Sequence, residues 1–333
     1  MRSTRLIRRL LLSLATTAAA GCGDQSEITG PHTPPSPNFV RLQSELGDYI
    51  GAGQAYNYTQ ADADIVVAAS GGHLSIQING DQWWFGDFEV PSALSRLQPG
   101  NYTGLQRYPF HDRAKGGLDW FGEGRGCNTL SGSFSVDSVT YVKDTLTTID
   151  LRFEQHCEGV AAALRGTIHW RSDDATGPPG PVNPIPANLW RPAPGSTPST
   201  GDYVYLNSEA GDYIGAGLTY TYTPLNATIG VTANGGLLSV TVSGWTGDFR
   251  AMSKLSQLEV GYYPDLERYP FNNPRKGGLD WSGQGRGCNT LEGWFAIDGV
   301  TYTSGTLTAI DLRFEQHCEG GTPALHGAIH WRG

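Results

Sequence analysis

Apolar and polar residues alternate along several segments of the chain. Residues 130–136 place apolar or small side chains at the even positions and serines at 131, 133 and 135. Residues 149–157 alternate in the same way, and one face carries Ile149, Leu151, Phe153, Gln155 and Cys157. Residues 164–170 form a third such segment. A period of two over these lengths predicts half-buried β-strands.

The remaining pattern predicts an all-β chain. Further strands are expected near 39–45, 63–69 and 72–79, and a turn is expected at 143–144. After residue 21, no segment has the 3.6-residue period of an amphipathic helix. About eight short strands in about 130 residues fit a β-sandwich or jelly roll, and a closed barrel is the alternative.

Much of the chain is present twice. The repeated motifs are GDYIGAG (47–53 and 211–217), KGGLDW (115–120 and 276–281), RGCNTL (125–130 and 286–291) and IDLRFEQHCEG (149–159 and 310–320). Residues 107–171 and 268–332 are identical at 45 of 65 positions. A period of about 160 residues is too long for a solenoid repeat, so it predicts two tandem homologous domains, 39–171 and 202–333.

A segment rich in proline and glycine, 172–201, separates the two copies. This composition predicts a semi-extended linker. Trp190 is its one aromatic residue, and we consider it a candidate for docking onto a domain face.

The amino terminus predicts export. Residues 1–21 combine four arginines with an apolar run, 10–20, that is shorter than the roughly 20 residues needed to cross a bilayer. Such a segment is typical of a secretory signal peptide. The polar, proline-rich residues 22–38 that follow are expected to form a tether.

The sequence Ala-Ala-Gly-Cys at 19–22 resembles a bacterial lipobox, with alanine at the position that is usually leucine. The resemblance implies lipidation of Cys22, and Gly23 after it favours the outer membrane. We therefore expect an exported lipoprotein, anchored in the membrane and displayed at the outer membrane or cell surface. An ordinary signal peptide followed by an unmodified cysteine is the alternative.

The cysteine count agrees with this interpretation. Of five cysteines, Cys22 is the odd one, and the others form two pairs with equal spacing: Cys127 with Cys157, and Cys288 with Cys318. Disulfides are expected in an exported protein, and each loop of this length contributes roughly 3.5–4 kcal/mol. Metal binding would need further ligands, and no CxxC or HxxxH spacing supplies them, so we expect no metal and no cofactor.

Charge excludes one class of partner. The formal net charge is −9, and it becomes −13 when the four arginines of the signal peptide are removed. Nucleic acid requires a basic surface and is therefore not an expected partner. The 45 glycines fit tight turns, and in the GDYIGAG segments Asp48 and Asp212 are expected to accept hydrogen bonds from nearby backbone amides.

Tryptophan supplies the first candidate ligand site. Exposed tryptophans on a β-sheet can stack on sugar rings or on a protein partner. The candidates are Trp84, Trp120, Trp245, Trp281 and Trp294. Trp294 falls on the outward face of its strand, and only one residue of the Trp83-Trp84 pair can point inward. The alternative is that these side chains belong to the core.

A second candidate is a polar site on one strand face of each copy. It consists of Arg152, Glu154 and His156, repeated as Arg313, Glu315 and His317. These residue types could act in acid–base catalysis. We favour the alternative, a solvated sheet face with cross-strand ion pairs.

The pattern RGCNTL…LRFEQHCEGG…PALHG resembles a β-rich repeat unit of secreted multi-domain chains and lipoproteins of bacteria. The resemblance covers about 39–171 and 203–332. The first copy departs from it, because it has EGVAAAL at 158–164. The resemblance implies an extracellular accessory module and transfers no catalytic or binding residue.

Taken together, these features predict a lipid-anchored surface protein with two tandem non-catalytic binding modules. The expected ligand is carbohydrate or another envelope polymer, or else a surface protein. Two copies would increase the avidity for a repetitive polymer. A secreted hydrolase that uses the Arg/Glu/His faces and a purely structural spacer are the alternatives.

Overall fold

The structure, a computed structural model, describes residues 37–333. These residues form twenty β-strands, and among them there is no helix that could cross a membrane. The predicted signal peptide, the lipidation site Cys22 and nearly all of the tether lie outside the described residues.

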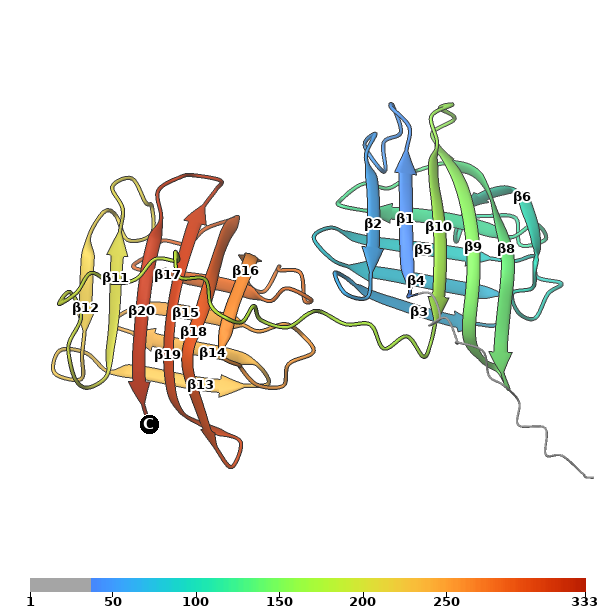
Figure 1. The fold of residues 1–333 in the computed structure, drawn as a ribbon. Coiled ribbons are helices and arrows are strands. Elements are labelled where there is room, and N and C mark those ends of the chain that lie inside the picture. The colour runs from blue at the N-terminus through green and yellow to red at the C-terminus, as the bar shows by residue number, and fades with distance from the viewer. Residues whose placement is uncertain (1–36) are drawn as a thin grey trace, which may run out of the picture. The chain divides into compact units, whose positions relative to one another are not determined.

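Each copy of the repeat contains ten strands (Figure 1). The first domain comprises β1 (Phe39–Ser44), β2 (Ala55–Thr59), β3 (Asp64–Ser70), β4 (His73–Asn79), β5 (Trp83–Glu89), β6 (Gly100–Arg107), β7 (Gly117–Gly122), β8 (Leu130–Val142), β9 (Thr145–Cys157) and β10 (Leu164–Arg171). The second comprises β11 (Tyr203–Ser208), β12 (Thr219–Tyr222), β13 (Ile229–Asn234), β14 (Leu237–Val242), β15 (Trp245–Arg250), β16 (Gly261–Arg268), β17 (Gly278–Gly283), β18 (Leu291–Thr303), β19 (Thr306–Cys318) and β20 (Leu325–Arg332).

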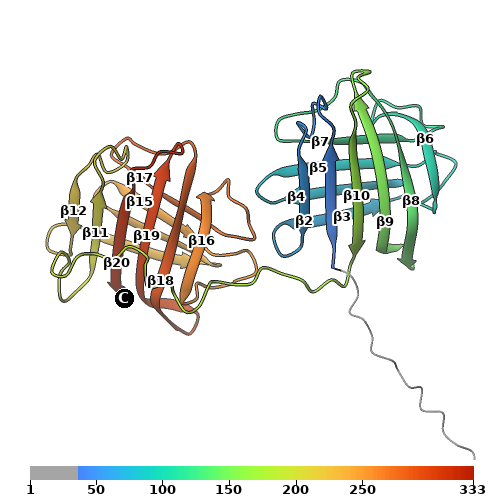
Figure 2. The ribbon, with the colours of Figure 1, turned by 45° about the horizontal axis from the view of Figure 1, so that its top comes forward.

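One continuous sheet makes up each domain. In the first domain its order is β2-β1-β10-β9-β8-β6-β7-β5-β4-β3, and the second domain repeats this order. Only the pairing of β6 with β7, and of β16 with β17, is parallel. Figures 1 and 2 show that β1, β2 and β8–β10 form one layer, whose strands run across those of a second layer made by β3–β5 and β7. The sheet is thus folded over itself around a single core.

The predicted all-β class with two tandem homologous domains is confirmed. The strands expected near 39–45, 63–69 and 72–79 are β1, β3 and β4, and the long hairpin of β8 and β9 turns at 143–144. The prediction of about eight strands was too low. No strand was predicted at β2, β5, β6 or β7. Strand β5, with the sequence WWFGDFE, carries aromatic residues on both faces and lacks the alternation of a half-buried strand.

Aromatic rings fill the space between the layers. Trp120 of β7 stacks on Phe153 of β9 with a centroid distance of 5.0 Å. Glycines directly opposite on the adjacent strands leave room for both rings: a Cβ on Gly86 would lie 2.4 Å from Trp120, and one on Gly166 would lie 1.9 Å from Phe153. These glycines therefore serve close packing inside strands, a role that the turn-based interpretation of the glycine content did not include.

A buried glutamine joins the two layers. Gln155 of β9 is fully buried, and its side-chain amide pairs with the backbone of Trp120 in β7. The amide nitrogen donates to the Trp120 carbonyl at 2.8 Å, and the amide oxygen accepts from the Trp120 N–H at 2.9 Å. Gln316 and Trp281 form the same pair in the second domain. The side chain thereby satisfies two backbone groups that would otherwise be unpaired in the core.

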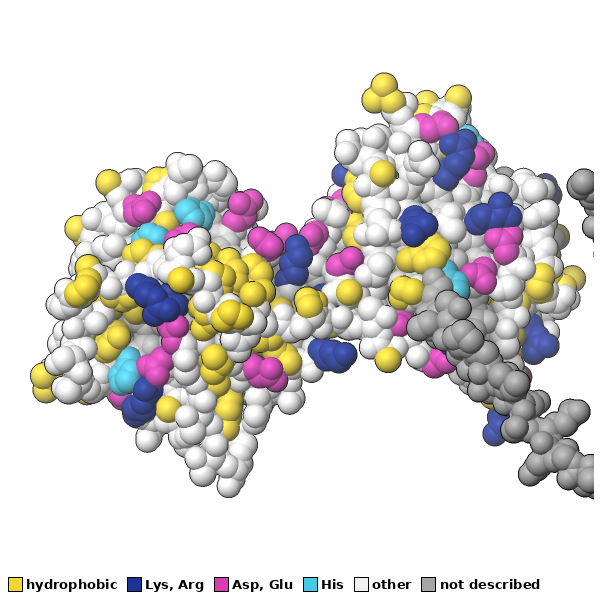
Figure 3. Space-filling view, viewed as in Figure 1, with side chains coloured by type: hydrophobic (Ala, Val, Ile, Leu, Met, Phe, Trp, Pro, Cys, Tyr) yellow, Lys and Arg dark blue, Asp and Glu magenta, His cyan; other side chains and the backbone are white. Residues whose placement is uncertain are grey.

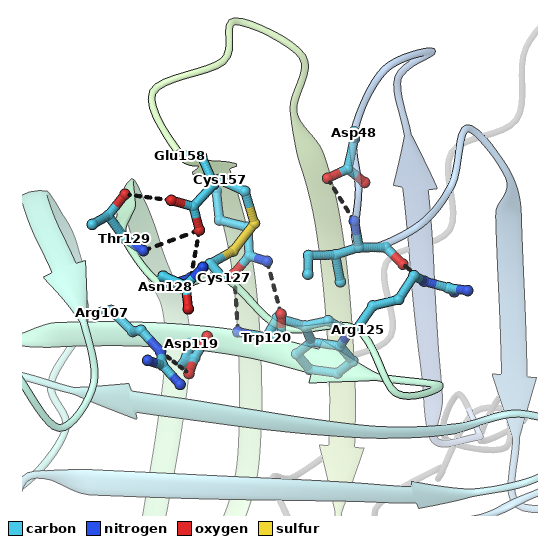
Figure 4. The surroundings of a disulfide bond; sticks show 12 residues. Asp48, Arg107, Asp119, Trp120, Arg125, Cys127, Asn128, Thr129, Cys157 and Glu158 are labelled. Atoms are coloured by element: carbon cyan, nitrogen blue, oxygen red, sulfur yellow. Dashed lines mark hydrogen bonds and ion pairs between the residues drawn. A yellow bond between two sulfur atoms is a disulfide. The ribbon is translucent and has the colours of Figure 1, made fainter.

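The disulfides form as predicted, within each copy. Cys127 bonds to Cys157 and Cys288 to Cys318, with Cα–Cα distances of 5.2 Å. Figure 4 shows the surroundings of the first bond, where Glu158 accepts hydrogen bonds from the backbone N–H groups of Asn128 and Thr129. The repeated RGCNTL and IDLRFEQHCEG motifs are therefore joined by the disulfide and by the hydrogen bonds of Glu158.

The GDYIGAG loop is held in the predicted way. Asp48 accepts hydrogen bonds from the backbone N–H groups of Ile50 and Gly51, and Asp212 does the same in the second copy. Arg125, from the RGCNTL motif, donates to the Ile50 carbonyl at 2.7 Å. The GDYIGAG and RGCNTL motifs are thus joined by a hydrogen bond, so both have a structural role in each domain.

Replacing the buried glutamine tests this account. Gln155→Leu keeps the volume but leaves the N–H and C=O of Trp120 unpaired, so we expect it to destabilise the first domain by about 2–4 kcal/mol. Hydrogen exchange of the full chain, measured on peptides from each domain, should show the loss in 39–171 only. Gln316→Leu is the matched variant and should shift the effect to 203–333; an equal effect on both domains from either variant would contradict the prediction.

Candidate functional site

None of the tryptophans selected from the sequence is exposed. Trp84, Trp120, Trp245 and Trp281 have at most 1% of their surface accessible, and Trp294 has 8%. Four of them fill the cores, and Trp294 lies on the outer face of β18 against Tyr262. The expectation that these side chains stack on a ligand is therefore wrong.

Trp84 was selected in place of Trp83 because the sequence does not show which of the two side chains points outward. Trp83 and Trp84 are adjacent in β5 and so point to opposite faces. Trp84 points into the core, where its indole N–H donates to the hydroxyl of Tyr58 at 2.8 Å. Trp83 points outward and is 50% exposed. Both are equally apolar, so hydrophobicity could not decide between them.

The polar residues of the first copy lie on the outer face of β9, and each is paired. Arg152 makes two hydrogen bonds to Asp137, both at 2.7 Å. Glu154 accepts from Arg165 at 2.7 Å and lies 3.1 Å from the imidazole of His156. In Figure 3, basic and acidic side chains stand next to each other on this face. The arrangement matches the ion-paired sheet face that the sequence favoured, and it gives no support to a hydrolase.

In the second copy, linker residues lie against the equivalent face. The side chain of Arg313 is only 5% exposed, and Trp190 stacks on His326 with a centroid distance of 4.8 Å. Glu315 lies 3.1 Å from His326 and 3.4 Å from His317. The hydrogen bond from His326 lowers the pKa of Glu315 to about 2. The docking of Trp190 onto a domain face thus occurs as anticipated.

An exposed group of aromatic residues lies on the other layer of the first domain. Trp83, Phe85 and Phe121 project outward from β5 and β7, and we call them the aromatic row. Phe85 stacks on Phe121 with a centroid distance of 5.3 Å, and Trp83 meets Phe85 edge-on at 5.6 Å. Trp83 is exposed and the two phenylalanines are partly exposed. Together they offer a nearly continuous apolar surface on a sheet face.

Strand register places further side chains beside this row. Val66, Gln77, Phe85 and Phe121 are direct neighbours across β3, β4, β5 and β7. The amide of Gln77 donates to Asn79 at 3.1 Å, and both side chains are partly exposed. The row therefore has amide hydrogen-bonding groups at its edge as well as an apolar surface.

The second domain has no such row. The equivalent neighbours across β13, β14, β15 and β17 are Gly230, Thr241, Thr246 and Ser282, and Gly244 precedes Trp245. The strands pair in the same order in both copies, but β13, β14 and β15 have six residues each where β3, β4 and β5 have seven. The second domain therefore differs in its side chains and in the ends of these strands. The two copies differ in sequence at these positions, so the difference was visible in the sequence. Its meaning depends on the position of β5, which the sequence pattern did not predict.

One buried carboxylate has a disturbed protonation equilibrium. Asp119 of β7 lies opposite Asp87, and its side chain is 5% exposed. Arg107 donates to one oxygen at 3.2 Å, as Figure 4 shows, whereas the other oxygen has no hydrogen-bond partner among residues 37–333. Burial raises the pKa of Asp119 to about 6, although Arg107 opposes the shift. Because Asp119 is so enclosed, we assign it a structural role and not contact with a substrate.

Residues 37–333 contain no cluster of histidine, cysteine and acidic side chains that could hold a metal ion. Comparisons with protein families, with curated proteins and with solved structures found no match to this chain. The aromatic row is the candidate binding site because its rings form a nearly continuous outward surface that the second domain lacks.

Asp119 makes the stability of the first domain depend on pH. Because its pKa is about 6 in the folded protein and about 3.8 otherwise, the folded state binds more protons between these values. Protonated Asp119 therefore contributes to the free energy of unfolding at about pH 4, and this contribution is lost as the pH rises through 6. The loss is at most about 3 kcal/mol. In Asp119→Asn, domain-resolved hydrogen exchange at pH 4.5 and 7.5 should show a smaller difference for 39–171. An unchanged difference would contradict the assignment, and Asp280→Asn provides the matched variant in the second domain.

Proposed function

We propose that this chain is an exported, lipid-anchored binding protein whose first domain binds carbohydrate through the aromatic row. The observation that carries the proposal is that an exposed tryptophan, Trp83, and two partly exposed phenylalanines, Phe85 and Phe121, lie side by side on the outer face of a sheet. Apolar side chains of this size are usually buried when a domain has only structural work to do.

The shape and chemistry of the row suit a sugar polymer. Aromatic rings on a sheet present apolar faces that can stack on the C–H faces of pyranose rings. Gln77 and Asn79, at the edge of the row, offer amide groups for hydroxyl groups of the ligand. The row is neutral, so the proposed ligand need not be charged.

Export and anchoring stay proposals that rest on the sequence of residues 1–22. The two disulfides are consistent with an oxidising compartment, where such bonds form and persist. An accessory module at the cell surface, as the sequence resemblance implies, would place the aromatic row among envelope and extracellular polysaccharides.

The two domains are not equivalent in this proposal. Because Thr246 and Ser282 replace the phenylalanines in the second domain, it lacks the stacking surface. We therefore propose that carbohydrate binds to the first domain alone, without the increase in avidity expected from two identical modules.

The test is retention of the full chain on insoluble cellulose, chitin and peptidoglycan, together with an array of soluble glycans. We expect binding to at least one polymer and a loss of about tenfold or more in Trp83→Ala, since aromatic anchors commonly contribute about 2 kcal/mol. The double variant Phe85→Thr, Phe121→Ser introduces residues that this sheet already accommodates in the second domain, and it should bind as weakly.

The matched control is Thr246→Ala, Ser282→Ala, which changes the equivalent surface of the second domain and should bind like the unmodified chain. Circular dichroism checks that every variant is folded. Binding that survives the loss of the aromatic row would reject this site. Failure to bind any polymer or glycan would reject carbohydrate binding and would favour the structural spacer.

A further inference from the structure

The linker lies against the outer face of the second domain, and this contact indicates a second binding surface on the first domain. Linker residues pair with and cover part of the second domain. Val182 forms two backbone hydrogen bonds with Tyr262 of β16, and Trp190 stacks on His326 of β20. Figure 1 shows the linker crossing in front of β18, β19 and β20. The outer face of these strands is therefore a site that accepts an extended peptide.

An arginine recognises the backbone of that peptide. Arg313 of β19 uses Nε and Nη2 to bond Asp298, which fixes the guanidinium plane. Its remaining terminal nitrogen, Nη1, donates to the carbonyl oxygen of Trp190. A guanidinium held in this way presents a rigid donor, because its fork geometry is already set by the carboxylate.

The first domain contains the same device. Arg152 of β9 bonds Asp137 through Nε and Nη2, both at 2.7 Å. Within residues 37–333, Nη1 of Arg152 has no hydrogen bond, and the side chain is 59% exposed, compared with 5% for Arg313. The donor that binds a peptide carbonyl in the second domain is thus directed at solvent in the first.

The groove around Arg152 is open and has a volume of about 260 Å³. Its lining comprises Ser133, Ser135, Arg152, Glu154, Arg165 and Thr167 together with the backbone between them. The second domain has Trp294, Ala296, Ala328 and His326 at the positions of Ser133, Ser135, Thr167 and Arg165. Three of these four residues are apolar where the linker is bound, and all four are polar where the face is exposed, as expected for a surface that binds reversibly.

We infer that the outer face of β8, β9 and β10 binds an extended peptide of a partner protein that has an aromatic residue followed by a basic residue and proline. The aromatic carbonyl accepts from Arg152, as the carbonyl of Trp190 does from Arg313. The aromatic ring stacks on the guanidinium of Arg165, which occupies the position of His326 and is held flat by Glu154 and Glu45. Proline keeps the peptide extended and lowers the entropy lost on binding.

This site differs from the aromatic row in layer and in chemistry, so the two can be tested separately. The probe is a labelled peptide of residues 186–196, PANLWRPAPGS, added to the full chain. The second domain is already occupied by the covalently attached copy of this segment, which outcompetes added peptide through its high effective concentration. Saturable binding measured by fluorescence anisotropy should therefore report the first domain.

We expect Arg152→Gln and Arg152→Lys to weaken binding at least about tenfold, because both lose the fixed donor. Arg96→Gln is the control, since Arg96 is an exposed arginine of the first domain outside this groove. Replacing the tryptophan of the peptide by alanine should weaken binding to a similar extent. Hydrogen exchange should show protection in 130–136 and 150–156.

Three outcomes would overturn the inference. Absence of saturable binding would reject a peptide site on this face. Protection confined to the second domain would mean that the probe merely displaces the linker. Binding that appears only after residues 23–36 are deleted would assign the face to the chain's own amino-terminal segment and not to a partner.

Discussion

The hydrogen bonds between the amide of Gln155 and the backbone of Trp120 hold the two layers of the first domain in a fixed relation. Strand β6 pairs with β7 only through Gln106–Gly117 and Arg107–Leu118, so within the described part of the chain the backbone of Trp120 has no strand partner on that side. The glutamine supplies a donor and an acceptor there, inside a core that is otherwise aromatic. Stacking of Trp120 on Phe153, and the two glycines that admit these rings, depend on the register that this pair maintains. The same constraint recurs in the second domain through Gln316 and Trp281.

Comparing the two copies distinguishes residues that build the fold from residues that give each surface its chemistry. The motifs that are identical in both copies form loops, disulfides and layer contacts, so their identity reflects construction of the fold. The copies differ where side chains face outward. The first has the aromatic row and an open arginine groove, whereas the second has small polar residues on one layer and a seated linker on the other. A difference between two copies of one fold is therefore the better guide to binding.

The alternation of residues predicted β8, β9 and β10 because each has one buried and one solvated face. It could not predict β5, in which Trp83 and Trp84 are equally apolar and only register assigns them to opposite sides. For the same reason the sequence selected the buried tryptophans and missed Phe85 and Phe121. The pairing of cysteines was predictable from spacing, and the ion-paired character of Arg152 and Glu154 from their shared face. The contact of Arg313 with the carbonyl of Trp190 joins residues 123 positions apart in the sequence, which no local pattern encodes.

The attachment of the linker at Val182 shortens the connection between the domains. Of the segment after Arg171, only residues 172–181 precede this first anchoring point. Such a stretch spans at most about 35 Å when fully extended, about a third of what the whole segment to Tyr203 could reach. The linker after Val182 therefore belongs to the second domain as part of its surface, and only about a third of the proline-rich segment is left to connect the two domains.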